Sequence, residues 1–330
     1  MKVFVIGAGS WGTALANVLA DNENEVVIYA RDKARVREIN EEHTNKKYFD
    51  TILNSSLKAT DELNLVSEYE YVLLAVPSGT SIKMAEQIAP MVKKPVVLIN
   101  SAKGFSPDTH DRLSVEISKF FKPEQLKAYA AILGPSHAEE VVERMQTTVN
   151  IVCEDDEVAK QLQKMFANNY FRVYRNDDMI GCEYGAGLKN IIAIASGILY
   201  GVGLGDNAKA SLMTRGLAEM TRYGVKMGGK KETFMGLCGM GDLIVTCTSR
   251  FSRNWQAGYT IGCNDDAEEF WKTNTKTVEG VEACRIIKQE ADKLNISMPM
   301  TDELYKVLFE NNKPSQAIND LMNRELKQEN

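Results

Sequence analysis

The opening stretch of the chain, MKVFVIGAGSWGTALANVLA at residues 1–20, indicates the fold. Residues 3–6 are an apolar run long enough for one buried strand of a parallel sheet. Residues 13–20 are predicted to form a helix, and between the two lie three glycines in the spacing G-x-G-x-x-G: Gly7, Gly9 and Gly12. A strand, a glycine-rich turn and a helix in this order are typical of a dinucleotide-binding site, and the alternative is a turn with a structural role only.

Each glycine of this motif has its own physical role. Gly7 permits the tight turn from strand to helix, Gly9 lets the backbone approach a pyrophosphate, and Gly12 lets the helix pack close to the strand. The free N–H groups and the dipole at the start of the helix then favour an anion. A second predicted strand, residues 25–30, follows at the distance that a dinucleotide-binding unit needs.

Length and composition are those of a globular protein with room for more than one domain. The chain has 330 residues, of which 44% are hydrophobic, and two domains are the expectation for this length. The formal net charge of −6 gives no indication of a nucleic-acid partner. The six cysteines never occur as C-x-x-C and there are only three histidines, so we expect no metal site and free thiols in a reducing compartment.

Two features of the sequence indicate where in the cell the protein is expected. A predicted core strand directly follows Met1, which leaves no room for a signal peptide. The longest apolar stretch, residues 191–204, is too short to span a bilayer and is predicted to be a buried helix. We therefore expect a soluble, cytoplasmic protein without a membrane span.

The end of the second predicted strand indicates which dinucleotide is preferred. NAD-selective sites carry an acidic residue near this point, which binds the ribose 2′-hydroxyl. Here the corresponding residues are Tyr29 and Ala30, followed by Arg31. An arginine suits a 2′-phosphate, so NADP is favoured over NAD; the alternative is an arginine that faces solvent in a loop. Asp32 is close enough to leave the use of both cofactors open.

Further strands and a change of pattern predict the domain organisation. Residues 33–68 are expected to be helix and loop. The remaining strands are predicted at residues 71–76, 96–100, 130–133, 147–153 and 171–174. From Met179 onward helical patterns dominate. We therefore predict a doubly wound α/β dinucleotide-binding domain of the Rossmann type at residues 1–178 and an all-helical domain at residues 179–330.

Polar residues follow the ends of several predicted strands. Ligands of an open parallel sheet bind at the carboxyl ends of its strands. Pro77, Lys103 and Ser136 lie at such ends. Lys103 is therefore a candidate ligand of a phosphate or of the cofactor.

The predicted helical domain contains an unusual lysine. Lys189 and Asn190 are the only strongly polar residues in the apolar stretch 184–205. Such a lysine either extends its ammonium group to the edge of the apolar region or acts in the interior. In the interior, desolvation and neighbouring cations lower the pKa of a lysine, which suits a general base. The sequence leaves both interpretations open.

Two further stretches are candidates for the same site. GLCGMGDLIVTCTS, residues 236–249, places Asp242 in a glycine-rich turn whose glycines could equally be packing residues. Ser252, Arg253 and Asn254 then follow together. An arginine offers paired donors to a phosphate, and serine and asparagine add hydrogen bonds. The alternative for this triplet is an ordinary loop or a helix cap.

These stretches carry a resemblance that covers nearly the whole chain. The motifs are GAGSWGTALA, NSAKG, GPSHAEEV, GAGLKNIIAIASG, TRGLAEMTRYG, GMGDLIVTCTS, FSRN and TVEG. In order and content they resemble the bacterial-type NAD(P)-dependent sn-glycerol-3-phosphate dehydrogenases. The resemblance implies reversible hydride transfer between sn-glycerol 3-phosphate and NAD(P), which gives dihydroxyacetone phosphate and serves phospholipid biosynthesis. It also implies a homodimer, a helical domain like that of the 6-phosphogluconate dehydrogenases, and a site between the two domains.

The resemblance further implies roles for individual residues. Lys189 matches the proton acceptor, with Asn190 and Asp242 beside it as catalytic residues. The implied substrate contacts are Lys103, Gly134, Ser136, Lys189, Asp242, Ser252, Arg253 and Asn254. Besides the three glycines of the opening motif, the implied cofactor contacts are Ser10, Trp11, Arg31, Lys103, Ala138, Arg253 and Glu279.

Two other functions share part of this pattern. A dehydrogenase of the 3-hydroxyacid or 6-phosphogluconate type has the same architecture and a catalytic lysine, but GMGDLIVTCTS and FSRN speak against it. A non-catalytic NAD(P)-sensing protein needs the glycine motif but has no need of Lys189, Asp242 and Arg253 together.

Overall fold

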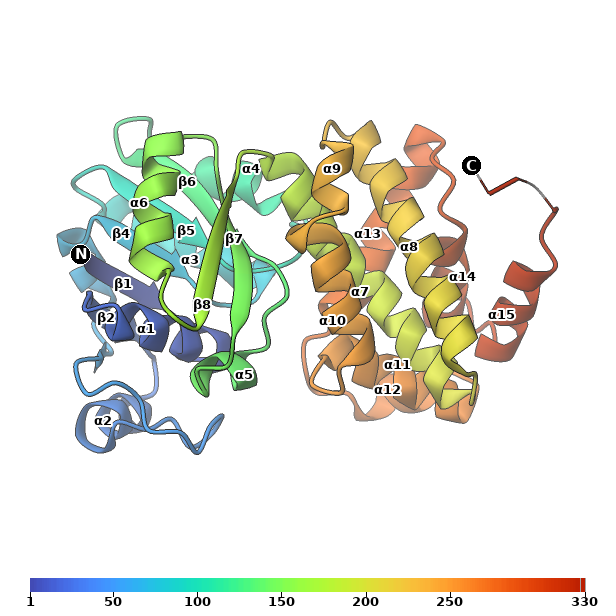
Figure 1. Cartoon of the computed structure of the whole chain (residues 1–330), viewed down its shortest axis with the longest axis horizontal. Helices are drawn as coiled ribbons and strands as arrows, with labels where there is room; N and C mark the ends of the chain where they lie inside the picture. Colours follow the sequence, from blue (N-terminus) through green and yellow to red (C-terminus); the bar gives the residue numbers. More distant parts are fainter. Residues whose placement is uncertain (327, 330) are drawn as a thin grey trace. The chain divides into compact units, whose positions relative to one another are not determined.

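The computed structural model describes residues 1–326 and 328–329 and contains two compact units, Met1–Glu183 and Tyr184–Asn330 (Figure 1). Helix α7, Met179–Gly201, begins in the first unit and continues into the second. The boundary after residue 178 that the sequence predicts lies immediately before this helix.

The first unit, all of whose residues are described, is built on one sheet with the strand order β3-β2-β1-β4-β5-β6-β7-β8. The strands are β1 (Lys2–Ile6), β2 (Glu25–Tyr29), β3 (Lys58–Thr60), β4 (Tyr71–Leu74), β5 (Val96–Asn100), β6 (Leu126–Leu133), β7 (Thr147–Cys153) and β8 (Phe171–Asn176). From β3 to β6 in this order, each strand runs parallel to its neighbour. The direction in which successive strands are added to the sheet reverses between β1 and β4. This order confirms the predicted doubly wound sheet of the Rossmann type.

Helices cover both faces of the sheet (Figure 1). Val3 and Val5 of β1 pack in the cluster on one face, and Phe4 and Ile6 pack in the cluster on the other, because successive strand residues point to opposite sides. One cluster includes residues of α1 (Ser10–Asp21), α5 (Ala138–Val142) and α6 (Asp156–Phe166); the other includes α3 (Ser78–Ile88), η2 (Ala89–Met91) and α4 (Leu113–Ser118). Because both faces of the central strands β1, β4 and β5 are covered, these strands are nearly continuous apolar runs, which is why the sequence reveals them. In the edge strand β8 alternate residues are exposed.

Strand β7 runs antiparallel to β6, which departs from the parallel sheet expected from the sequence. The connection between them contains only the five-residue helix α5. A helix of that length advances about 8 Å, whereas the seven residues of β7 extend over about 23 Å. The chain therefore turns back beside β6 instead of crossing over to begin a parallel strand.

The segment 33–68 was predicted as helix and loop, and that prediction is wrong at β3. It contains α2 (Lys33–Glu42), the edge strand β3 and the 3₁₀ helix η1 (Leu63–Glu68). The three residues of β3 are too few to show an alternating pattern. Helix α1 also begins three residues earlier than predicted, because its N-cap is Gly9.

The second unit contains no strand among its described residues, as the helical patterns predict. After α7 it contains α8 (Asp206–Lys226), α9 (Lys231–Phe234), η3 (Leu237–Gly241), α10 (Asp242–Thr248), α11 (Arg253–Asn264), α12 (Glu268–Thr273), α13 (Glu279–Leu294), α14 (Pro299–Phe309) and α15 (Pro314–Met322). No helix in the described part of the chain has the length and apolar character needed to cross a membrane.

Candidate active site

The turn between β1 and α1 has the geometry that the three glycines predict. Gly7 has a φ of +115°, and a Cβ there would lie 2.7 Å from the Ala75 carbonyl oxygen. A Cβ on Gly12 would lie 1.9 Å from the Gly7 carbonyl oxygen, so only glycine lets α1 start this close to the strand. A Cβ on Gly9 would meet no atom within 4 Å. Gly7 and Gly12 are thus required by the fold, and Gly9 is not.

The open space at Gly9 fits the pyrophosphate of a dinucleotide. Gly9 is the N-cap of α1, and no side chain caps the first turn of this helix. The N–H groups of the first turn are therefore directed to a space in which a ligand can accept their hydrogen bonds. Ser10 and Trp11 begin the helix and are partly exposed. The residues present fit NAD(P) at this turn, and the contacts themselves stay predictions.

The end of β2 lies beside the same turn. The Gly7 N–H donates a hydrogen bond to the Tyr29 carbonyl oxygen over 3.2 Å. Arg31 follows; its side chain is exposed and makes no hydrogen bond or ion pair within the described residues. Asp32 caps α2, since its Oδ1 accepts from the Ala34 N–H at 3.0 Å. One carboxylate oxygen of Asp32 is therefore already used by the helix.

Three other predicted cofactor contacts lie in the first turns of helices. The indole Nε1 of Trp11 is buried without a hydrogen-bond partner among the described residues. Ala138 is the first residue of α5 and is buried. Glu279 is the first residue of α13 and is partly exposed.

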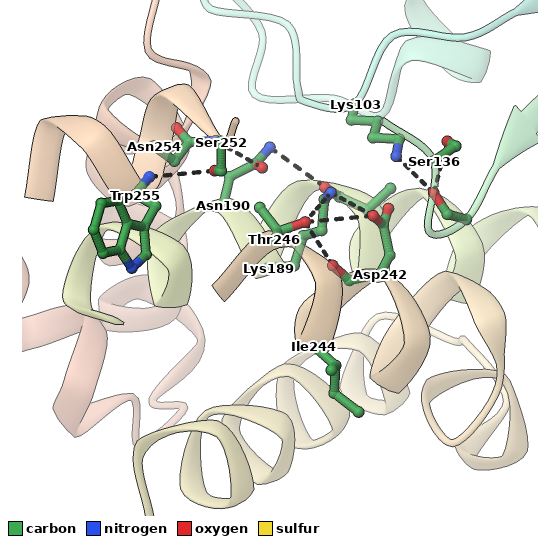
Figure 2. Close-up of polar contacts among 12 residues, drawn as sticks. Lys103, Ser136, Lys189, Asn190, Asp242, Ile244, Thr246, Ser252, Asn254 and Trp255 are labelled. Carbon is green, nitrogen blue, oxygen red and sulfur yellow. Dashed lines mark hydrogen bonds and ion pairs between the residues drawn. The ribbon is translucent and has the colours of Figure 1, made fainter. Parts of the chain in front are cut away.

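Lys103, Gly134 and Ser136 come together at the carboxyl edge of the sheet, as their positions after β5 and β6 predict. The Lys103 Nζ donates to the Gly134 carbonyl oxygen at 2.8 Å, and the Ser136 Oγ donates to the same oxygen at 3.1 Å (Figure 2). Gly134 has a φ of +140°, and a Cβ there would lie 3.1 Å from Val149 Cα. The glycine turn thus presents its carbonyl to both side chains.

In the helical unit, Lys189 lies in the interior and does not reach the edge of the apolar region. Its Nζ is 2.6 Å from Oδ1 of Asp242 and 2.7 Å from Oγ1 of Thr246 (Figure 2). All three residues are buried, with exposed fractions of 4%, 1% and 5% respectively. This burial excludes the interpretation in which Lys189 extends its ammonium group to the edge of the apolar region. Its role as a general base stays a prediction.

The packing of α7 explains how Asp242 reaches the lysine. Gly185 lies one turn before Lys189, and a Cβ there would be 2.6 Å from the Cys238 carbonyl oxygen. The π-helical segment η3 can therefore approach the backbone of α7 closely, and α10 begins at Asp242 directly after it. Gly239 packs as tightly, since its Cβ would lie 2.1 Å from the Phe234 carbonyl oxygen. Gly239 is thus a packing residue, which is the alternative that the sequence left open for the glycines of residues 236–249.

Thr246 was not identified from the sequence. Its Oγ1 donates to the Asp242 carbonyl oxygen at 2.5 Å and accepts from the Lys189 Nζ. Its spacing of four residues from Asp242 could have identified it, because residues four apart lie on the same face of a helix.

Asn190 belongs to a separate chain of hydrogen bonds. Its Oδ1 accepts from Asn254 Nδ2 at 2.9 Å (Figure 2). Asn254 Oδ1 in turn accepts from the Gly280 N–H at 2.9 Å. These contacts join α7, α11 and the start of α13. Asn190 and Asn254 are both buried, so their amides hold three helices together at this point.

Ser252 and Arg253 differ in their surroundings. Ser252 is the N-cap of α11, and its Oγ accepts from the Trp255 N–H at 3.2 Å (Figure 2). The helix-cap interpretation therefore holds for Ser252. Arg253, the first residue of α11, is exposed and makes no hydrogen bond or ion pair with any residue that the structure describes. Its guanidinium is available to an anion.

Comparison with known proteins gives the family. The model of the NAD-dependent glycerol-3-phosphate dehydrogenase N-terminus matches residues 2–159, and that of the C-terminus matches residues 178–319. A glycerol-3-phosphate dehydrogenase (NAD(P)+) of Exiguobacterium is 45% identical, over 99% of this chain and 97% of its own length. One of Halalkalibacterium halodurans is 46% identical, over 99% of this chain and 95% of its own. The chain belongs to the NAD-dependent glycerol-3-phosphate dehydrogenase family.

A solved structure in this family has the same fold. The crystal structure of the glycerol-3-phosphate dehydrogenase of Coxiella burnetii is 35% identical and has a TM-score of 0.90, covering 98% of this chain and 99% of that one. Membership in this family separates the chain from the dehydrogenases of the 3-hydroxyacid and 6-phosphogluconate types that the sequence left as alternatives.

Proposed function

We propose that this chain catalyses the reversible NAD(P)-dependent interconversion of sn-glycerol 3-phosphate and dihydroxyacetone phosphate. The observation that carries the proposal is the buried ammonium group of Lys189, held by Asp242 at 2.6 Å and by Thr246 at 2.7 Å. A positioned group of this kind is what proton transfer to the C2 oxygen of the substrate needs. The relatives, which are named glycerol-3-phosphate dehydrogenases, support the same reaction class.

Lys189 moves the proton in this mechanism. NAD(P), when bound, supplies the hydride that C2 gains on reduction and accepts it on oxidation. In the reduction, Lys189 Nζ donates a proton to the C2 oxygen as the carbonyl becomes a hydroxyl; in the oxidation, the uncharged amine accepts that proton. Asp242 favours the ammonium form through its opposite charge. Thr246 directs an oxygen lone pair at Nζ, because its own proton is donated to the Asp242 carbonyl.

Arg253 holds the substrate phosphate. It is exposed at the first turn of the twelve-residue helix α11, where the helix dipole also favours an anion. A guanidinium can donate two parallel hydrogen bonds to phosphate oxygens. Ser252 and Asn254, also proposed as substrate contacts, are held in this turn by their own hydrogen bonds. Lys103, with Gly134 and Ser136, is proposed to contact cofactor and substrate at the carboxyl edge of the sheet.

We further propose that the protein prefers NADP, through Arg31, and that it is a cytoplasmic homodimer. Its product, glycerol 3-phosphate, is then available to phospholipid biosynthesis. Light scattering after size-exclusion chromatography measures the molar mass, and the mass of a single chain at assay concentrations contradicts the homodimer.

The assay of the proposed activity follows NADPH oxidation with dihydroxyacetone phosphate. We expect turnover by the wild-type protein. Lys189→Met lowers kcat by roughly 10²–10⁴-fold, as loss of a general acid does. Arg253→Ala chiefly raises KM for the substrate, because the phosphate is bound in ground and transition states alike. The control is Lys226→Met, because Lys226 is exposed at the end of α8; this variant leaves both constants unchanged.

Two results contradict the proposal. Absence of turnover by the folded wild-type protein with either NADPH or NADH argues against the activity. A folded Lys189→Met variant with near-normal kcat shows that the lysine is structural and that the proton comes from another group.

A further inference from the structure

A second arginine lies against the glycine-rich turn. Arg35 is in the first turn of α2, which follows β2 and Arg31. Its Nη1 donates a hydrogen bond to the Ala8 carbonyl oxygen at 3.2 Å. Ala8 lies between the first two glycines of the motif, so a positive charge lies at the backbone of the proposed dinucleotide site.

The position of the Arg35 guanidinium is well defined. It lies over the Tyr48 ring, 5.2 Å from the centroid, and its side chain is only 14% exposed. Its charge is only weakly balanced, since Nη2 is 3.8 Å from an oxygen of Asp32, whose side chain is 58% exposed. A guanidinium fixed in this way has already lost most of its side-chain freedom, so an anion that binds it has less ordering cost to overcome.

The cation already proposed as a cofactor contact, Arg31, precedes Arg35 by four residues. Arg31 is exposed and has no hydrogen bond or ion pair to other described residues. Both arginines follow the end of β2, where the Gly7 N–H donates to the Tyr29 carbonyl oxygen. This is the end of the strand at which a Rossmann-type site recognises the 2′ position of the adenosine ribose.

We propose that Arg35 is a second specificity-determining residue of the cofactor site and that, together with Arg31, it binds the adenosine 2′-phosphate of NADP. The inference rests on the proposed function in that it requires a dinucleotide at the glycine-rich turn. A phosphate monoester offers three acceptor oxygens and up to two negative charges, which suits two guanidinium groups better than one exposed arginine. NADH lacks this group and gains nothing from Arg35.

Asn45 provides an internal comparison for this proposal. Its Nδ2 donates to the same Ala8 carbonyl at 3.2 Å and to Thr13 Oγ1 at 2.9 Å. Asn45 is fully buried and uncharged, so it can affect the cofactor only by holding the turn. A residue that acts through the turn alone should matter equally for both dinucleotides, whereas a phosphate ligand should distinguish them.

The experiment titrates NADPH and NADH into the wild-type protein and three variants, with Kd from fluorescence. Arg35→Gln raises Kd for NADPH roughly ten- to a hundredfold, the loss of one charge-assisted hydrogen bond, and changes Kd for NADH less than about threefold. Asn45→Ala raises both constants by a similar factor. Arg37→Gln is the matched control, because Arg37 lies on the same helix, is 76% exposed and pairs with Glu41; it changes neither constant.

A second substitution of Arg35 and a salt series keep the test valid even if the Arg35→Gln variant is unstable. Arg35→Lys keeps the charge and loses the paired donors, so it retains part of the preference for NADPH. The NADPH affinity of the wild type falls more steeply with salt than that of Arg35→Gln, because screening acts on the phosphate contact.

The outcomes against the inference are distinct from those against the proposed function. Equal loss of NADPH and NADH affinity in Arg35→Gln shows that Arg35 only holds the turn, and unchanged affinities show that it makes no contact; either result overturns the inference. A folded wild-type protein that binds neither dinucleotide overturns the proposed function, and this inference with it.

Discussion

The Lys189 ammonium nitrogen lies 2.6 Å from Oδ1 of Asp242, and both side chains are buried in the helical unit. The two residues come from α7 and α10, and Thr246 bonds to the same nitrogen. A buried ion pair of this kind contributes little net stability, because both charges have left water, but removing one partner leaves the other uncompensated. The pair is therefore better explained by chemistry than by stability.

Stability measurements can separate these two explanations. Lys189→Met alone leaves Asp242 buried without its cation, so we expect the free energy of unfolding to fall by about 3–5 kcal/mol. The double variant Lys189→Met with Asp242→Leu removes both charges and should recover most of that loss while remaining inactive. Urea unfolding and the turnover assay measure the two effects. If the double variant is no more stable than the single one, the ion pair itself contributes to the stability of the fold.

Loss of the Thr246 hydroxyl should lower kcat by the amount that one hydrogen bond to Lys189 contributes. Thr246→Val keeps the shape of the side chain and removes the hydroxyl that accepts from Lys189, so we expect kcat to fall roughly two- to tenfold. Thr248→Val is the matched control, since Thr248 lies on the same helix, donates to the carbonyl four residues before it and is exposed. Equal kcat in the two variants contradicts a role for Thr246 in positioning the lysine.

Two glycines of the opening motif should respond differently to the same substitution. Gly9 has a φ of −79° and open space around its missing side chain, so Gly9→Val should fold normally and lose NADPH binding. Gly12→Val places a side chain against the Gly7 carbonyl, so it should lower the melting temperature or fail to fold. Thermal unfolding and a fluorescence titration test this. Normal NADPH binding by folded Gly9→Val refutes the pyrophosphate site.

The buried Glu219 of α8 should make stability fall as the pH rises. Its carboxylate accepts from the Met300 N–H at 2.7 Å, at the start of α14, and burial raises its pKa from 4.5 to about 7. The folded state therefore holds a proton that the unfolded state releases. The stabilisation, of the order of 3 kcal/mol, is fully present below about pH 4.5 and is lost as the pH rises through about 7.

Glu219→Gln tests this dependence, because glutamine keeps an acceptor for the Met300 N–H and does not titrate. The free energy of unfolding, measured in urea across this pH range, should decline less in the variant than in the wild type. Parallel curves for the two proteins show that Glu219 does not account for the decline.

Much of the first unit could be predicted from the sequence because its signals are local. Strands β5 and β7 have the bounds that their apolar runs predict, 96–100 and 147–153. A buried strand is recognisable wherever an apolar run lies between turn residues. The direction of β7 was not predictable in this way, since it depends on how far the connection after β6 can reach. The three residues of β3 carry too little pattern to be recognised.

The sequence by itself determined the glycine-rich turn, the order of the strands and helices apart from β3, and the chemical groups available to a site. Only the tertiary structure decided which groups meet. Lys189 is stable in the interior because Asp242, 53 residues later, supplies a carboxylate at 2.6 Å. Arg35 faces the turn because α2 brings it to the Ala8 carbonyl, 27 residues earlier. Such contacts arise from the packing of elements that are distant in the chain, and no local pattern of residues encodes them.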